Sequence, residues 1–181
     1  MKQLRAEFRG FSLIEVLVAL VIIGVGMLGI AKIQALAYAS TGTASLRSLA
    51  AIEASSLASA MRANRSYWSV TAQTVLQTIQ ITGAAITSST DAALTGVNNC
   101  TSGATCIPQN LAAYDLQNWV TSLNTLLPGD TATVSCIPNP TANYPVGCTI
   151  TVSWAERNTG INAQSQGTAM ALPSYTLYVE P

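Results

Sequence analysis

Residues 11–31 read FSLIEVLVALVIIGVGMLGIA, and this apolar run constrains how the whole chain can fold. A helix needs about 20 apolar residues to cross the hydrocarbon core of a bilayer, so the run is long enough for one membrane span. Lys2, Arg5 and Arg9 precede the run and are expected to stay in the cytoplasm under the positive-inside rule. We therefore predict a single-pass protein whose residues beyond Lys32 lie outside the cytoplasm.

Glu15 is a charged residue inside this apolar run. An acidic side chain near the membrane interior costs at least about 2.5–3.5 kcal/mol, and a buried carboxylate usually needs a cation. One interpretation is that Glu15 is interfacial and marks the start of the span. The other is that a free amine, created by cleavage before Phe11 in the same chain or in a neighbour, pairs with the carboxylate.

The sequence GFSLIEVLVAL at residues 10–20 resembles the class III signal of type IV prepilins and pseudopilins. In that family a prepilin peptidase cuts after the glycine and methylates the new amino terminus, and the glutamate is needed for assembly. The resemblance therefore implies cleavage between Gly10 and Phe11, N-methylation of Phe11 and an assembly role for Glu15. It also implies an inner-membrane protein before assembly and a pilus protein at the cell surface afterwards.

Two other classes of amino-terminal segment fit parts of this sequence. One is an ordinary signal anchor, and the other is a secretory signal, because Ala35-Leu36-Ala37 and Ala37-Tyr38-Ala39 both satisfy a small-x-small cleavage rule. The apolar run is long for a secretory signal, and neither alternative accounts for Glu15. We therefore prefer the prepilin interpretation.

Beyond Lys32 the helical pattern continues. Apolar residues recur at three- and four-residue spacing and predict one buried helix face: Ala50, Ala54, Leu57, Ala58 and Met61. A continuous helix from Phe11 to Met61 would run about 75 Å at about 1.5 Å per residue, which exceeds one membrane thickness. Its outer half should therefore lie on a soluble domain. The expected divisions are a leader at 1–10, a transmembrane half-helix at 11–31, an outer half-helix at 32–65 and a head domain at 66–181.

The head domain reads as one helix followed by strands. An apolar stripe predicts a helix over Leu111–Leu127, with Trp119 in the core, and Pro128-Gly129 ends it. Val75, Leu76, Ile79 and Ile81 suggest a further helical turn or a short strand, and the Ala, Thr, Ser, Gly and Asn content of 83–104 suggests a loop. Strands are predicted over 131–136, 149–154 and 175–179. The expected fold is α+β: a long amino-terminal helix, first transmembrane and then amphipathic, packed on a small antiparallel sheet.

Four cysteines lie beyond the apolar run: Cys100, Cys106, Cys136 and Cys148. An even number in an exported chain indicates two disulfides. A four-cysteine zinc site is the alternative, but no pair has the C-x-x-C spacing that such sites favour. The short spacing of the first two cysteines, and the position of the last two on either side of a predicted hairpin loop, favour pairing in chain order. Sequence alone leaves the other two connectivities open.

Composition argues against catalysis and nucleic-acid binding. The chain is 49% hydrophobic and only 9% charged, and it contains no histidine, so the usual general base and commonest zinc ligand are missing. We predict no enzyme activity, no cofactor and no metal. Beyond Lys32 the carboxylates outnumber the arginines and no basic stripe is present, so we expect no nucleic-acid partner.

Blocks in the outer part resemble minor pilins of the PilV group. They are LAAYDLQNW at 111–119, LLPG at 126–129, ITVSW at 150–154 and GMLGIA at 26–31. The resemblance implies a low-abundance structural subunit that primes or supports pilus assembly and sits near the tip. Its implied partners are the prepilin peptidase, other minor pilins, the major pilin and the inner-membrane assembly platform. A minor pseudopilin of a type II secretion system is the alternative. An adhesin or DNA-uptake receptor, using an exposed Tyr67, an exposed Trp68 or the disulfide loop, is less favoured.

Overall fold

The computed structural model describes residue 10 and residues 12–71, 76–96, 99–101, 106–137, 145–156 and 172–181, with the side chains of residues 70 and 71 left aside. The chain divides into two compact units, Met1–Gly42 and Thr43–Pro181. Helix α1, Leu13–Ala63, has 51 residues, so it begins in the first unit and ends in the second.

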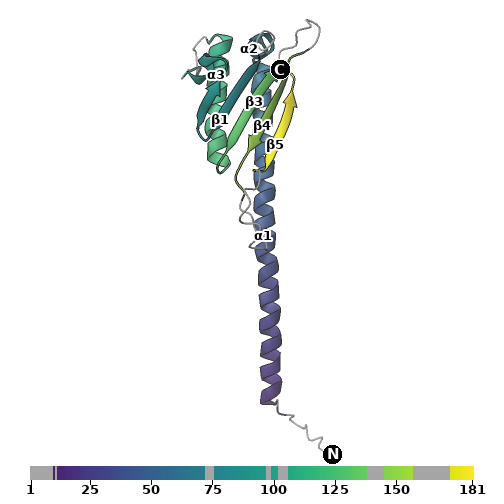
Figure 1. Ribbon diagram of the computed structural model, residues 1–181. Helices are drawn as coiled ribbons and strands as arrows, with labels where there is room; N and C mark the ends of the chain where they lie inside the picture. Colours follow the sequence, from purple (N-terminus) through teal and green to yellow (C-terminus); the bar gives the residue numbers. More distant parts are fainter. Residues whose placement is uncertain are drawn as a thin grey trace, which may run out of the picture. The chain divides into compact units, whose positions relative to one another are not determined.

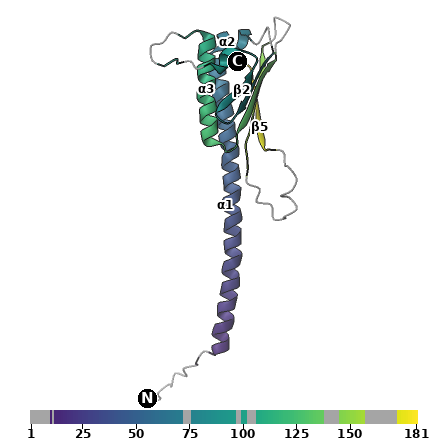
Figure 2. The ribbon, with the colours of Figure 1, turned by 60° about the vertical axis from the view of Figure 1, so that its left-hand side comes forward.

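The second unit is an α+β domain built around an antiparallel sheet of five strands in the order β2-β1-β3-β4-β5. Its elements after α1 are α2 (Arg65–Thr71), β1 (Gln77–Thr82), β2 (Ala85–Ser89), the 3-10 helix η1 (Ala92–Thr95), α3 (Pro108–Leu126), β3 (Thr131–Ile137), β4 (Gly147–Ser153) and β5 (Ser174–Val179). Figures 1 and 2 show α3 beside the carboxyl-terminal part of α1, with both helices on the same face of the sheet. The predicted fold class, a long helix packed on a small antiparallel sheet, is therefore confirmed.

The core lies between the two helices and the sheet. The buried residues of α1 include all five members of the predicted apolar face, together with one unexpected residue, Glu53. Helix α3 contributes Trp119, which is 5% exposed, and its indole Nε1–H donates a hydrogen bond of 2.8 Å to the main-chain carbonyl of Glu53. The predicted core position of Trp119 is confirmed. A buried indole usually finds a hydrogen-bond partner, and here the partner belongs to the neighbouring helix.

The strands alternate between the core and solvent, as expected for a sheet with one covered face. In β3 the inward residues are Ala132, Val134 and Cys136, and in β4 they begin with Cys148. Cys136 lies directly opposite Cys148 in the β3–β4 register. The outward positions of these two strands carry mainly threonine and serine, which combine β-propensity with polarity.

Strand β2 was not predicted, because residues 83–104 read as a loop. Residues 85–89 instead pair with β1 through a two-residue turn at Gly83 and Ala84. Gly83 has a positive φ of 57°, a conformation that glycine adopts without strain, and its N–H donates to the carbonyl of Asp130 at 3.0 Å. The interpretation of this segment as a loop is therefore wrong for residues 85–89 and right for the tight turn before them.

The suggestion that Tyr67 and Trp68 are exposed contact residues is also wrong. Each is 2% exposed, and their rings meet edge to face at 5.1 Å. The Tyr67 hydroxyl donates to Asp91 Oδ2 at 2.8 Å, and the Gln109 amide donates to the same oxygen at 2.9 Å. Burial alone would raise the pKa of Asp91, but the bonds from Gln109, Tyr67 and the Ala93 N–H together hold it below its ordinary value. Asp91 therefore joins α2, η1 and the start of α3.

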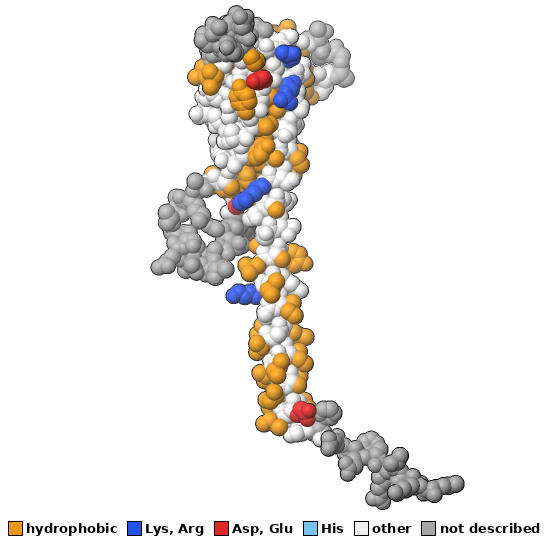
Figure 3. Space-filling model, turned by 90° about the vertical axis from the view of Figure 1, so that its right-hand side faces the viewer, with side chains coloured by type: hydrophobic (Ala, Val, Ile, Leu, Met, Phe, Trp, Pro, Cys, Tyr) orange, Lys and Arg blue, Asp and Glu red, His pale blue; other side chains and the backbone are white. Residues whose placement is uncertain are grey.

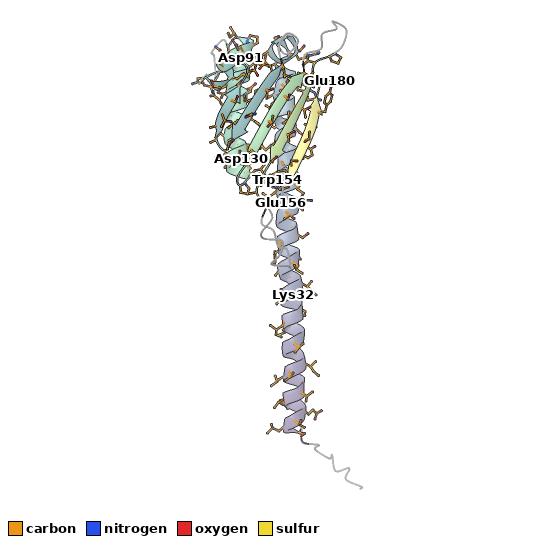
Figure 4. All side chains as sticks on the ribbon, viewed as in Figure 1. Lys32, Asp91, Asp130, Trp154, Glu156 and Glu180 are labelled. Atoms are coloured by element: carbon orange, nitrogen blue, oxygen red, sulfur yellow. A yellow bond between two sulfur atoms is a disulfide. The ribbon has the colours of Figure 1, made fainter. Side chains whose placement is uncertain are left out.

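Asp130, directly before β3, has a different environment. It is 2% exposed, and neither carboxyl oxygen has a hydrogen-bond partner among the described residues. Burial raises the pKa of its carboxyl. Figure 4 shows Asp130 at the same end of the sheet as Trp154 and Glu156, whereas Asp91 and Glu180 lie at the opposite end. At the Glu156 end, Arg47 of α1 forms an ion pair with Glu156 at 3.2 Å, which fastens the helix to the segment after β4.

Candidate functional site

Helix α1 begins at Leu13, three residues after Gly10 of the prepilin-like sequence. The Ser12 carbonyl accepts hydrogen bonds from the Glu15 N–H at 3.0 Å and from the Val16 N–H at 3.3 Å, which closes the first turn. Glu15 lies in that first turn, where a carboxylate interacts favourably with the positive end of the helix dipole. The backbone thus gives a local reason for an acidic side chain at this end of an apolar helix.

Gly10 precedes this turn and is exposed. A Cβ atom built at Gly10 would meet no heavy atom within 4 Å, so the described part of the chain itself does not demand glycine there. A protease that cuts directly after Gly10 would require a small residue before the scissile bond, and this requirement is independent of the fold. Phe11 and the leader residues 1–9 lie outside the described residues, so the scissile bond and the methylation position remain sequence-based predictions.

Beyond Glu15 the amino-terminal part of α1 presents a predominantly apolar surface. None of its most hydrophobic 18-residue window is buried, and the helix is long and apolar enough to cross a membrane. Its large hydrophobic side chains are exposed around the helix, among them Leu13, Leu17, Leu20, Ile23, Met27 and Ile30. Figure 3 shows hydrophobic side chains along this helix. Because water disfavours such a surface, lipid or other apolar helices must cover it.

Several glycines lie within this apolar surface, and no contact within the described chain requires glycine at these positions. A Cβ atom at Gly24, Gly26 or Gly29 would meet no other atom of the described chain within 4 Å. Glycine inside a helix costs roughly 0.5–1 kcal/mol relative to alanine. Close approach of a second helix is a recognised use of small residues in an apolar helix. Ordinary variation within a membrane helix is the other interpretation, and intramolecular contacts do not distinguish the two.

All four cysteines form disulfides, Cys100 with Cys106 and Cys136 with Cys148. The first bond closes a short loop before α3, and the second crosses β3 and β4 on their buried side. These are the two pairs that the sequence favoured. Among the described residues, no group of three or more histidine, cysteine or acidic side chains is arranged to hold a metal ion.

The comparisons with known proteins concern the same amino-terminal segment. The family model for the prokaryotic N-terminal methylation motif matches residues 5–31, which include Gly10, Phe11 and Glu15. No curated protein and no solved structure gave a match. Together with the long apolar helix, the motif supports a type IV pilin-like protein, meaning a pilin or a pseudopilin anchored in the membrane. Such a leader implies processing by a prepilin peptidase and handling by membrane assembly machinery. The class is structural rather than enzymatic.

Proposed function

We propose that this chain is a minor type IV pilin, a structural subunit without catalytic activity that primes or supports pilus assembly. The observation that carries the proposal is the combination, on one helix, of a methylation motif and an exposed apolar surface that contains a single carboxylate near its start. A membrane anchor alone explains the apolar surface. It does not explain a cleavage motif placed directly before the helix or the acid four residues beyond Phe11.

The chemistry of assembly follows from charge and solvation. Cleavage after Gly10 would release a cationic amine at Phe11, close to the poorly solvated carboxylate of Glu15. In a helical filament, the offset between subunits would bring the Phe11 amine of one chain to the Glu15 carboxylate of another. A charge-assisted hydrogen bond between them would reward correct register, because an unpaired acid among apolar helices is costly. Exposed helix surfaces and their glycines would then form the packing core of the filament.

The minor-pilin assignment, and a place near the filament tip, rest on the PilV-like blocks. In the structure these blocks include much of α3, the turn after it and most of β4, which are core elements of the head. The finer assignment therefore depends on resemblance in the head, whereas the class depends on the leader. A minor pseudopilin of a type II secretion system remains the competing proposal, because it shares the leader.

Deletion of the chain separates these two roles. We measure surface pili by shearing cells and quantifying the major pilin in the sheared fraction, and we measure exoprotein secretion in the same cultures. The minor-pilin proposal predicts loss of sheared pili with secretion unchanged, and restoration of pili by the plasmid-borne chain. Loss of secretion with normal pili would support the pseudopilin alternative and contradict the pilus assignment.

A further inference from the structure

A groove between α1 and α3 in the second unit has features that the leader and the apolar helix do not explain. It has a volume of about 280 Å³ and is lined by Glu53, Ser56, Leu57, Ala60, Asp115, Asn118, Trp119 and Ser122. Two of these are carboxylates, one from each helix, and no lysine or arginine is among the lining residues. Sequence analysis did not single out either acid, since acidic residues on amphipathic helices usually face water.

Glu53 is the more buried of the two acids. It is 7% exposed although it carries a carboxylate. The Ser122 hydroxyl donates to Oε1 at 2.9 Å, and the structure gives Oε2 no partner among the described residues. A charged side chain this deeply buried normally has a cation beside it. Oε2 has no partner among the described residues but is not fully enclosed, so it is the oxygen of this carboxylate that stays accessible to solvent or to a ligand.

Asp115 lies on the opposite helix and is half-buried. Its side chain forms no hydrogen bond or ion pair with any described residue, and burial raises the pKa of its carboxyl. The amide of Asn118 and the hydroxyl of Ser56 add neutral polar groups to the same lining. The groove is thus acidic and polar, with a short apolar floor that includes Leu57 and Trp119.

We propose that this groove binds a basic side chain, arginine or lysine, from a neighbouring pilin-type subunit. The proposal rests on the proposed function, which supplies the neighbouring subunit. A guanidinium or ammonium group would pair with Oε2 of Glu53 and with Asp115, while the aliphatic stem of the side chain would lie against Leu57 and Trp119. Such pairing would set the register between adjacent heads, because charge complementarity contributes mainly to specificity.

Site-specific photocrosslinking in cells tests the occupant. p-Benzoylphenylalanine is placed at Asn118, which lines the groove and is exposed, in the full-length chain. A second probe at Leu20, in the apolar helix, reports assembly independently of the groove. Adducts are digested and mapped by mass spectrometry. The proposal predicts that the probe at Asn118 joins a pilin-type subunit at a segment that contains arginine or lysine.

The charge requirement is tested with Glu53→Gln combined with Asp115→Asn, which should lower the yield of the adduct at Asn118 about ten-fold or more. Glutamine keeps an acceptor for Ser122. Glu180→Gln, which removes an exposed acid outside the groove, should leave the yield unchanged. If the double variant does not accumulate, Asp115→Asn alone is used, since the Asp115 side chain makes no hydrogen bond to any described residue that the change would break.

The outcomes separate the inference from the proposed function. Adducts at Leu20 without adducts at Asn118, or adducts at Asn118 that persist in the charge variants or map to segments without basic residues, overturn the groove inference and leave the function standing. Loss of the Asn118 adduct on chelation of divalent cations, with recovery on adding CaCl₂, assigns the groove to a metal ion and also overturns it. Absence of adducts at both positions removes the proposed function and the inference together.

Discussion

The indole Nε1–H of Trp119 donates a hydrogen bond of 2.8 Å to the main-chain carbonyl of Glu53, and this bond joins α3 to α1 inside the core. Both residues are buried, so the bond is shielded from water. The bond sets the axial register of α3 against α1 at the place where both helices line the acidic groove. The head domain and the proposed recognition groove therefore depend on the same contact.

Trp119→Phe should destabilise the head by about 1–2 kcal/mol. The change removes one buried donor and some ring volume, while the Glu53 carbonyl can keep its helical hydrogen bond. Thermal unfolding of the detergent-solubilised chain, followed by near-ultraviolet circular dichroism, measures the effect. Tyr178→Phe is the control, because its ring is exposed and its hydroxyl has no hydrogen-bond partner among the described residues, so the change should cost less. An equal or larger cost for the control would contradict the role given to Trp119.

Asp130→Asn should raise stability at neutral pH by about 1–2 kcal/mol, because it replaces a buried carboxylate whose oxygens have no hydrogen-bond partner among the described residues. Because the pKa of Asp130 is raised in the folded state, the protonated carboxyl contributes favourably to folding stability. This contribution is complete below the ordinary aspartate pKa and is lost as the pH rises through the pKa of the folded state. The stability difference between variant and wild type should therefore be small in acid and grow toward neutral pH. Unfolding curves across this range measure it, with the exposed-acid variant Glu180→Gln as control. A variant that is less stable at neutral pH would show that Asp130 has a partner we have not identified.

The exported protein should contain no free thiols. Each short disulfide loop should contribute about 2–3 kcal/mol on the chain-entropy estimate. Thiol labelling under denaturing, non-reducing conditions measures the number of free cysteines. Labelling of two or more cysteines in protein isolated from the envelope would exclude the two-bridge arrangement.

The elements that could be predicted from the sequence are those in which the spacing of apolar residues is consistent with only a few arrangements of secondary structure. The apolar face of α1, the stripe of α3 and the alternation of β3 and β4 leave one consistent arrangement, since each element has a single apolar face. Strand β2 was missed because its short, half-exposed segment resembles a loop in composition. A usable signal was present: two β-prone runs separated by Gly83 and Ala84, the spacing of a two-residue hairpin.

The candidate site could be predicted only in part, because some of its residues belong to a contiguous motif and others come together only in the folded chain. Gly10 and Glu15 belong to a contiguous motif that can be read from sequence. Glu53 and Asp115 line one groove only after α1 and α3, which are separated by α2, the first hairpin and η1, have packed together, so no local sequence pattern predicts them. Tyr67 was misjudged for a related reason, since its burial and its hydrogen bond to the distant Asp91 arise only in the folded head.

Glu15→Val should be cleaved after Gly10 yet enter filaments poorly. The peptidase is expected to read the glycine and the span, whereas the carboxylate acts later, in docking between subunits. Valine keeps the helix and removes the charge, so membrane insertion should improve slightly. Fractionation compares mature protein in membranes with protein in sheared pili. Wild-type incorporation of the variant would show that Glu15 is only an interfacial residue.

Gly10→Val is the matched control for this experiment. It should block processing and leave the leader attached. A Cβ atom at this exposed position meets no heavy atom of the described residues beyond its chain neighbours within 4 Å, so a processing defect would report the peptidase and not a disturbed fold. Normal gel mobility and normal piliation in this variant would count against the cleavage site.

Mass spectrometry of the amino terminus of the mature protein tests the central claim most directly. The claim is that the chain is processed as a type IV pilin-like subunit, so the predicted result is a chain that begins at N-methylated Phe11. A mature protein that begins at Tyr38 or Ser40, or one that retains residues 1–10, would contradict it.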